Sequence, residues 1–337
     1  METAHVAFET LLLGNEIDHP CNTEHPIAFA TSSDPDTMHL DEAMRAPDRV
    51  QFQKAMRKEI NDQMTRKHWV IVPRSEVPIG MKVLPCVWSM KRKRRIDTRE
   101  VYKWKARLTV HGGRQEYGVN YWETYSPVVT WSSIRLFLTL TTLAGWKTRQ
   151  IDYVLAFPQA DVECDMYIDI PRGFNFKGSK KTHALKLLKN VYGTKQAGRV
   201  WNKHLAQGLI DKGFTQSRID ECVFYKKGYG LILIYVDDCI LCGPTTEGLD
   251  AMVKLLSNGY EIEDQGEMSD YLGVSIKRDT DGSIRLTQPH LIDQILTDLG
   301  LNQPYVKTHP TPAQVSPILG PDLDAPHVTK AGNIGLS

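Results

Sequence analysis

The sequence has 337 residues, of which 41% are hydrophobic, so the chain can form a core in one large domain or in two to three ordinary ones. Lysines and arginines (41) nearly balance aspartates and glutamates (40), so the net charge gives no indication of a nucleic-acid binder. Six scattered cysteines exclude a disulfide framework and favour a reducing, intracellular location; no apolar run of 18 residues and no basic-flanked signal is present, which excludes a membrane partner and a signal peptide.

The N-terminal part begins without a regular pattern. Residues 1–40 mix histidine, aspartate, threonine and serine with little period, which predicts an irregular lead-in. From Pro47 onward apolar side chains recur every four residues. This spacing predicts an amphipathic helix whose apolar stripe consists of Phe52, Met56, Ile60 and Met64.

Basic residues dominate the next segment. Three strands are expected there, over residues 69–72, 83–90 and 103–110. On the third strand Lys103, Lys105 and Arg107 occupy alternate positions, so they share one face. Residues 91–95 are all basic as well. These cations are as typical of a solvated face as of a phosphate site, and the basic run alone also fits a nuclear-localisation patch.

A largely buried helix is predicted from Trp131 to about Gly145, with serines near its start and glycine as its end signal. Its apolar residues are Ile134, Phe137, Leu138, Leu140 and Leu143. The apolar run over residues 150–158 then predicts a strand that ends at Pro158. It carries one carboxylate, Asp152, which requires a metal, a cation or a surface position because burying it unpaired is costly. Taken alone, Asp152 is a strand-end aspartate that faces water.

Two short apolar runs flank Asp237 and Asp238 and predict a β-hairpin with a carboxylate-bearing turn. Like charges side by side repel each other and raise a pKa unless cations neutralise them, which suggests divalent metals. Cys239 and Cys242 have the CxxC spacing of redox and zinc sites, but no second pair accompanies them. They are interpreted as small apolar strand residues.

The order of elements predicts the fold. Beyond those described above, we expect helices beginning near Ala197, Thr246 and Leu291 and strands over residues 222–225, 260–263 and 271–277. From 149 to 263 the order is strand, helix, hairpin, helix, strand, which is the split βαβ, ferredoxin-like arrangement of an α+β protein. In that arrangement the first strand neighbours the hairpin, so Asp152 lies close to Asp237 and Asp238.

Three converging carboxylates form a hard-oxygen site suited to Mg²⁺. Two such ions activate an attacking hydroxyl and stabilise the leaving oxygen of a phosphoryl displacement, so the site favours nucleotidyl transfer. The set contains no histidine, which argues against zinc hydrolysis. Nucleotide cyclases and repair polymerases share this kind of sheet, so the residues alone leave several enzymes open.

The motifs resemble one family. The YVDD turn at residues 235–238 resembles the (F/Y)-x-D-D turn of reverse transcriptases. Seven further blocks resemble the copia-type long-terminal-repeat retrotransposon polymerase, at residues 105–108, 123–129, 133–135, 152–157, 192–201, 220–224 and 271–274. The resemblance runs in order from about Asp41 to Pro312.

The resemblance implies a right-hand polymerase with palm, mixed α/β fingers and a partial thumb, the palm sheet having helices on one face. The implied divisions are an irregular lead-in (1–40), fingers with the first helix (41–148), palm with the catalytic hairpin (149–280), the start of a thumb (281–301) and a Pro-rich, disordered tail (302–337). Asp152, Asp237 and Asp238 become the catalytic triad. Two Mg²⁺ ions, or Mn²⁺ in their place, are expected on Asp152, Asp237 and the backbone carbonyl of Tyr153.

The resemblance also implies contacts to the incoming deoxynucleotide. Lys105 and Arg107 are expected at its triphosphate, with the choice between them left open, and Tyr153 lies beside the metals. Phe157 is expected beneath the sugar, where a rigid ring rejects a 2′-hydroxyl; without the resemblance it is a core phenylalanine. Gln196 is expected near the 3′-hydroxyl. The expected primer grip consists of Tyr271, Leu272 and Gly273.

The function implied is RNA-directed and DNA-directed DNA synthesis, with a primed RNA or DNA template and deoxynucleotides as partners. The expected location is cytoplasmic, in a virus-like particle, and the oligomeric state is left open. The chain is expected to be a piece of a larger polyprotein. One alternative is a truncated, inactive remnant that at most binds nucleic acid. Another is a cyclase-like palm that acts on free nucleotide without a primer.

Overall fold

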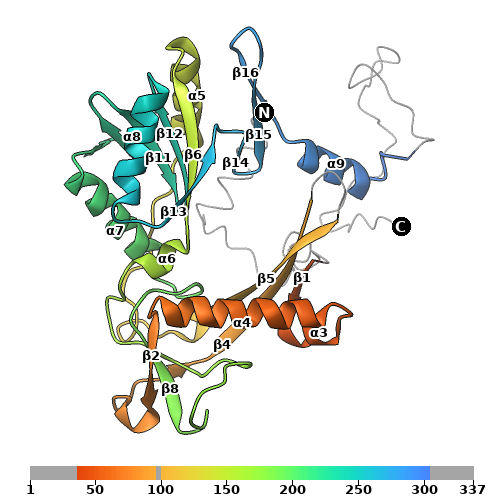
Figure 1. Cartoon of the computed structure of the whole chain (residues 1–337), viewed down its shortest axis with the longest axis vertical. Helices are drawn as coiled ribbons and strands as arrows, with labels where there is room; N and C mark the ends of the chain where they lie inside the picture. The colour runs from red at the N-terminus through yellow and green to blue at the C-terminus, as the bar shows by residue number, and fades with distance from the viewer. Residues whose placement is uncertain (1–35, 96–99, 304–337) are drawn as a thin grey trace, which may run out of the picture. The chain divides into compact units, whose positions relative to one another are not determined.

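The computed structural model describes residues 36–95 and 100–303, and they form two compact units divided between Met268 and Ser269. Three sheets belong to the first unit, and a three-stranded sheet followed by a helix belongs to the second. Figure 1 shows the elements in chain order. The expected mixture of helices and sheets is confirmed.

The central sheet of the first unit is antiparallel and has the order β13-β6-β12-β11-β10-β9. Its strands are β6 (Lys147–Tyr153), β9 (Thr215–Gln216), β10 (Val223–Lys226), β11 (Gly230–Tyr235), β12 (Asp238–Gly243) and β13 (Ile262–Gly266). The first strand, β6, pairs with both the hairpin strand β12 and the last strand β13, as the split βαβ arrangement requires. The predicted neighbourhood of the first strand and the hairpin is therefore confirmed.

Helices pack against this sheet through its apolar side chains. They are α5 (Trp131–Leu143), α7 (Ala197–Asp211) and α8 (Thr246–Ser257), and the one-turn helix α6 (Ala156–Gln159) contacts α7. In Figure 1, α7 and α8 lie beside β11 and β12. Ile151 and Cys239 are completely buried, and the Tyr153 ring meets the Trp201 ring of α7 edge-on at a centroid distance of 5.1 Å. Side chains alternate between the two faces of a strand, so Asp152 points away from this packed face.

A second sheet, β1-β4-β5, packs on the first long helix. The elements are β1 (Thr37–His39), α3 (Leu40–Arg45), α4 (Arg49–Thr65), β4 (Cys86–Arg94) and β5 (Val101–Val110). Asp48 precedes α4 and accepts hydrogen bonds from the Arg92 guanidinium and, at 2.6 Å, from the indole of Trp104. These donors hold the pKa of Asp48 well below its usual range. These hydrogen bonds join the start of α4 to β4 through Arg92 and to β5 through Trp104.

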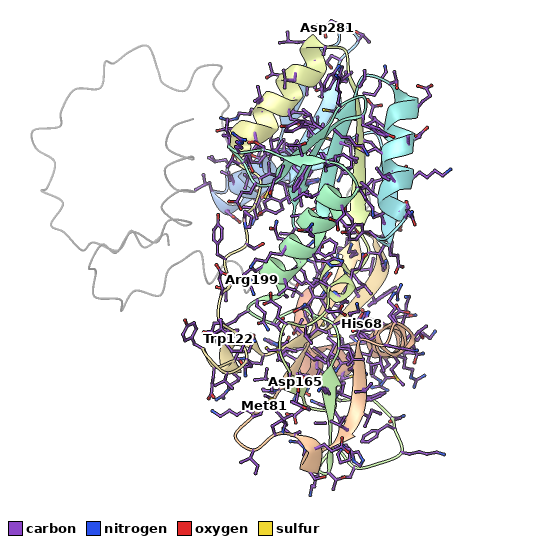
Figure 2. The ribbon with its side chains drawn as sticks, turned by 90° about the vertical axis from the view of Figure 1, so that its left-hand side faces the viewer. His68, Met81, Trp122, Asp165, Arg199 and Asp281 are labelled. Atoms are coloured by element: carbon purple, nitrogen blue, oxygen red, sulfur yellow. The ribbon has the colours of Figure 1, made fainter. Side chains whose placement is uncertain are left out.

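A third sheet completes the first unit, with the order β2-β8-β7-β3. Its strands are β2 (Trp69–Pro73), β3 (Val83–Leu84), β7 (Tyr167–Ile168) and β8 (His183–Leu187), and the short 3-10 turns are η1 (Arg74–Glu76) and η2 (Gly112–Arg114). Arg199 of α7 ties two nearby loops together, because it donates to the Glu123 carbonyl at 3.0 Å and pairs with the Glu163 carboxylate. Figure 2 shows Arg199 with Trp122 and Asp165, which lie in these loops.

The second unit consists of β14 (Asp270–Tyr271), β15 (Val274–Arg278), β16 (Ile284–Thr287) and α9 (Pro289–Asp298). Leu272 and Gly273 both have positive φ, 50° and 78°, as in the type I′ turn that joins two antiparallel strands. The prediction of one continuous strand over residues 271–277 is therefore wrong. The chain reverses at Leu272, whose left-handed backbone a leucine seldom adopts.

Two predicted apolar stripes are only partly correct. Phe52, Met56 and Ile60 are buried, but Met64 is 46% exposed. A spacing of four residues turns an α-helix by about 400°, so the stripe drifts by about 40° at each step and has left the core face after three steps. In α5, Leu140 and Leu143 are 39% and 80% exposed. At about 100° per residue they lie about 120° and 180° around the helix from the buried Ile134. The expected burial of these two leucines is wrong.

Three further expectations change at element boundaries. The strand predicted over residues 150–158 ends at Tyr153, and Ala156–Gln159 form the one-turn helix α6. The irregular lead-in is shorter than expected, because residues 37–39 form β1 and α3 begins at Leu40. The rest of that lead-in and nearly all of the Pro-rich tail lie outside the described residues. Within the described ranges, no helix combines the length and apolar character needed to cross a membrane.

Candidate active site

The pairing of three strands places acidic side chains in one row. Asp238, the first residue of β12, lies directly opposite Asp152 of β6, and Glu263 of β13 lies opposite Asp152 on the other side. Residues directly opposite each other in an antiparallel sheet point to the same face. The sequence indicated Asp152 and Asp238 but missed Glu263, because only the strand register shows which residue of β13 faces them.

Asp237 lies in the two-residue turn that joins β11 to β12. The residue before it, Val236, has a φ of 58°, which is a strained conformation for a β-branched residue. Two hydrogen bonds hold the turn: the Trp201 indole donates to the Val236 carbonyl at 2.6 Å, and the Tyr153 amide donates to the Asp237 carbonyl at 3.1 Å. Hydrogen bonds from α7 and from the end of β6 therefore hold the carboxylate-bearing turn in place.

The carboxylates destabilise each other's charged forms. Burial raises the pKa of Asp152 to about 6, with further contributions from Asp237, Asp238 and Glu263 and opposition from Lys105. Burial and the neighbouring Asp237 also raise the pKa of Asp238. Since desolvation and like charge both disfavour ionised carboxyls, a bound cation would relieve the repulsion.

The donor set fits a hard divalent cation in kind. Carboxylate oxygens are the ligands that Mg²⁺ prefers, and Asp152 and Asp238 offer them from one face of the sheet, with Asp237 in the turn beside them. Among the described residues, however, no group of three or more His, Cys, Asp or Glu side chains is arranged to hold a metal ion. The side chain of Tyr153 is 1% exposed on the opposite face, so only its backbone is available to a metal.

Tyr192 lies beside the carboxylates, although the sequence analysis assigned it no role. Its ring centroid is 4.9 Å from that of Phe157, and the Arg107 guanidinium lies 4.3 Å from the same Tyr192 centroid. Burial raises the pKa of Tyr192 to about 12; Arg107 opposes this shift, and Asp237 and Asp152 add to it. Phe157, Tyr192 and Arg107 therefore form a continuous row of contacts next to the carboxylates, in which the two rings are tilted by 45°.

Close contact with β5 explains why tyrosine and glycine are adjacent here. The Val110 amide donates to the Tyr192 carbonyl at 2.8 Å, and Gly193 follows with a φ of 89°. A Cβ on Gly193 would lie 2.2 Å from the Val110 carbonyl oxygen, so only glycine fits. The Tyr-Gly pair at positions 192 and 193 is thus the sequence signal that could have indicated this site residue.

Lys105 and Arg107 both border the site, from alternate positions of β5. Arg107 does so through Tyr192, and Lys105 through its electrostatic effect on Asp152. Burial and the neighbouring cations Arg107, Lys93 and Lys103 lower the pKa of Lys105 to about 8. A lysine that is disfavoured by other cations gains from a bound anion.

Gln196 is not exposed at this site. The side chain is 2% exposed, accepts a hydrogen bond from the Gln115 amide at 2.9 Å and donates to the Asn120 carbonyl at 3.2 Å. These bonds place it in a buried amide network behind the Tyr192 segment. The nucleotide contact expected for Gln196 stays a prediction.

The expected primer grip belongs to the second unit. Tyr271 is 2% exposed, and Leu272 and Gly273 form the turn between β14 and β15. The role of these three residues stays a prediction.

Known proteins have similar sequences. A sequence model described as reverse transcriptase (RNA-dependent DNA polymerase) matches residues 66–313. The Pol polyprotein of transposon TNT 1-94 from Nicotiana tabacum is 33% identical over 79% of this chain and 20% of its own length. That of transposon RE1 from Arabidopsis thaliana is 32% identical over 87% of this chain and 19% of its own length.

A solved foamy viral protease-reverse transcriptase in complex with double-stranded DNA is 13% identical, with a TM-score of 0.37, over 72% of this chain and 36% of that chain. This score is too low to bear on the fold. The family match and the transposon relatives agree with the motifs, although the chain spans about a fifth of the length of these relatives. The chain belongs to the reverse transcriptase (RNA-dependent DNA polymerase) family and is of the copia type.

Proposed function

We propose that this chain is an RNA-directed and DNA-directed DNA polymerase that transfers nucleotidyl groups from deoxynucleoside triphosphates to a primer 3′-hydroxyl. The observation that carries the proposal is the register of β6 and β12, which sets Asp238 opposite Asp152 with Asp237 in the adjoining turn. Membership of the reverse transcriptase family supports it.

Two Mg²⁺ ions, or Mn²⁺ ions, are the proposed cofactors, and Asp152, Asp237 and the Tyr153 carbonyl are their proposed ligands. When bound, such ions lower the pKa of the primer hydroxyl and stabilise the leaving pyrophosphate oxygen. Asp238 stands next to this set and adds negative charge. The raised pKa of Asp152 supports the proposal, because Lys105 only partly offsets the burial and the repulsion by the neighbouring carboxylates.

The nucleotide is proposed to lie between the carboxylate row and β5. Lys105 and Arg107 offer positive charge to its triphosphate, and Phe157 lies beneath its sugar. Tyr192, which lies between Phe157 and Arg107, extends this aromatic surface. A rigid aromatic pair leaves no room for a 2′-hydroxyl, so we expect deoxynucleotides to be selected.

The right-hand division of the polymerase is part of the proposal. Residues 41–148 are the proposed fingers, 149–280 the palm and 281–301 the start of the thumb, with the primer grip in the turn at Leu272. The boundary between the compact units, at Met268, precedes the proposed end of the palm. The proposed partners are a primed RNA or DNA template and deoxynucleotides.

Primer extension on poly-rA with an oligo-dT primer tests the proposal. We expect Mg²⁺-dependent incorporation of dTTP by the wild type, and a loss of at least about a thousandfold in Asp237→Asn because it removes a proposed metal ligand. Asp211→Asn, at an exposed carboxylate near the end of α7, is the matched control and should retain activity. Equal incorporation by wild type and Asp237→Asn would overturn the proposal.

The same assay separates the alternatives. An inactive remnant would bind the primed template without incorporation, in the wild type as in Asp237→Asn. A cyclase-like enzyme would consume nucleoside triphosphate when the primer is omitted.

A further inference from the structure

A one-turn helix, α6, carries Phe157 directly after the strand that carries Asp152. Between them the chain turns sharply at Leu155, which has a φ of 51°. A non-glycine residue in the left-handed region is strained, and no side chain caps the start of α6. A helix of four residues does not hold its own position, so other contacts must fix it.

The side-chain amide of Gln159, the last residue of α6, makes three hydrogen bonds to backbone groups. Its nitrogen donates to the Val154 carbonyl at 2.8 Å and to the Glu261 carbonyl at 2.9 Å. Its oxygen accepts from the Glu261 amide at 3.0 Å. The Val154 amide also donates to the Glu261 carbonyl, at 2.9 Å. Gln159 therefore acts like an added peptide group between the ends of β6 and β13.

These bonds close a ring around the strained residue. The ring runs from Val154 through Leu155 and Phe157 to Gln159 and back, so it fixes α6 relative to the strand that ends one residue before Val154. A second tie anchors the partner segment: Arg66, at the end of α4, pairs with the Glu261 carboxylate at 2.7 Å. The position of Phe157 relative to Asp152 is thus set by Gln159 and not by helix propensity.

We propose that Gln159 is a positioning residue for sugar selection. Its side-chain amide holds the Phe157 ring against Tyr192, in the position where the ring excludes a 2′-hydroxyl of the incoming nucleotide. The inference rests on the proposed polymerase activity and deepens it. The side chain of Gln159 is bonded to backbone and needs no contact with the nucleotide.

The test is the ratio of kcat/KM for dTTP to kcat/KM for UTP on poly-rA primed with oligo-dT. Gln159→Glu keeps the size of the side chain but replaces both donated hydrogen bonds by repulsion between oxygens. Because the loss of both bonds releases the Phe157 ring from its position, we expect the ratio to fall by about tenfold. A folding defect alone would lower both rates together and leave the ratio unchanged.

Three variants sharpen this test. Gln159→Met has similar length and no charge, and should show the same fall if Gln159→Glu does not fold. Glu261→Gln removes the ion pair with Arg66 but keeps the backbone groups that Gln159 binds, so its ratio should equal that of the wild type. In a Phe157→Ala background, Gln159→Glu should cause no further change, because the ring that it positions is absent.

The outcomes are distinguishable. An active wild type whose ratio is unchanged in folded Gln159→Glu or Gln159→Met overturns this inference and leaves the polymerase proposal intact. Failure of both variants to fold assigns Gln159 a purely structural role and also overturns it. A wild type without primed incorporation overturns the proposed function, and the inference with it.

Discussion

Asp152 and Lys105 illustrate how the site is left with unbalanced charge on both sides. The pKa of the carboxyl is raised to about 6 by burial and by other carboxylates, and the pKa of the amine is lowered to about 8 by burial and by other cations. A cation would relieve the first group and an anion the second. A metal-bound nucleoside triphosphate supplies both charges together, which is why these shifts support the proposed substrate.

Asp152 makes the stability of the metal-free protein depend on pH. Its pKa in the folded state, about 6, exceeds the ordinary value of 3.8, so the folded protein binds the proton more tightly than the unfolded chain. The stabilisation that the bound proton gives to the folded state is complete below the unfolded pKa of 3.8, and it is lost as pH rises through the folded pKa of about 6. We expect thermal unfolding in EDTA to show a midpoint that falls less steeply between pH 4 and about 6 in Asp152→Asn.

Asp211→Asn is the control for this measurement and should retain the wild-type slope. Added Mg²⁺ should raise the midpoint of the wild type at pH 7.5 and have little effect on Asp152→Asn. Identical pH slopes for wild type and Asp152→Asn would show that burial and the neighbouring carboxylates do not raise the pKa of Asp152 as the structure indicates.

Lys105 predicts a pH dependence of nucleotide binding. With a pKa of about 8, its ammonium is lost between pH 7 and 9, and the triphosphate loses a counter-charge. We expect KM for dTTP to rise over this range in the wild type and to rise less in Lys105→Arg, whose guanidinium stays charged. Lys103→Arg, on the same strand face, should follow the wild type. A KM that changes equally in all three proteins would exclude Lys105 from the triphosphate site.

The turn between β11 and β12 depends on an interaction from another element. Trp201 of α7 is 1% exposed and donates to the carbonyl of the strained residue Val236. Trp201→Phe keeps an aromatic ring in the core but leaves that carbonyl without its donor. We expect the free energy of unfolding to fall by about 1–2 kcal/mol and kcat to fall more than KM for dTTP changes.

Denaturant unfolding and steady-state kinetics measure these two effects of Trp201→Phe. Trp88→Phe removes another buried indole, one that donates to the Arg172 carbonyl in the β4 region, and is the matched control. It should lose stability without a selective fall in kcat. A kcat equal to that of the wild type in Trp201→Phe would show that the turn keeps its geometry without the indole.

The elements that the sequence predicted well are those with a regular apolar period. The hairpin around Asp237 and the neighbouring strand with Asp152 follow from alternating or continuous apolar runs, and their pairing follows from the order of elements. The end of β6 was not predictable in this way. The turn at Leu155 is stabilised by hydrogen bonds that Gln159 makes to Val154 and Glu261. Gln159 directly follows an apolar run with the composition of a strand, and Glu261 is distant in the sequence, so neither residue indicated the turn.

Side-chain positions at the site were predictable only where a motif or the order of elements fixed them. The three aspartates follow from like charges on neighbouring strands and from the YVDD resemblance. Tyr192 and Glu263 were missed because their places depend on the approach of a loop to β5 and on the register of β13. Gln196 belongs to the same motif as Tyr192, but its side chain bonds within a buried amide network. A sequence motif does not show which of its side chains point toward the site.

The chain as a whole spans about a fifth of the length of the transposon relatives that it resembles. The order β13-β6-β12-β11 brings Asp152 near the end of β6 close to Asp237 in the turn before β12, although 85 positions separate them in sequence, and the family match covers this region completely. The two relatives described above are about five times as long as the matched segment. Activity of this chain by itself is therefore the point on which the account depends.

Single-nucleotide extension of a primer on an RNA template of mixed sequence tests that point most directly. Each of the four deoxynucleotides is offered alone with Mg²⁺, to the wild type and to Asp237→Asn. We expect the wild type to add only the nucleotide complementary to the next template base, and Asp237→Asn to add none. Addition without regard to the template, addition by Asp237→Asn at the wild-type rate, or no addition by the wild type would contradict it.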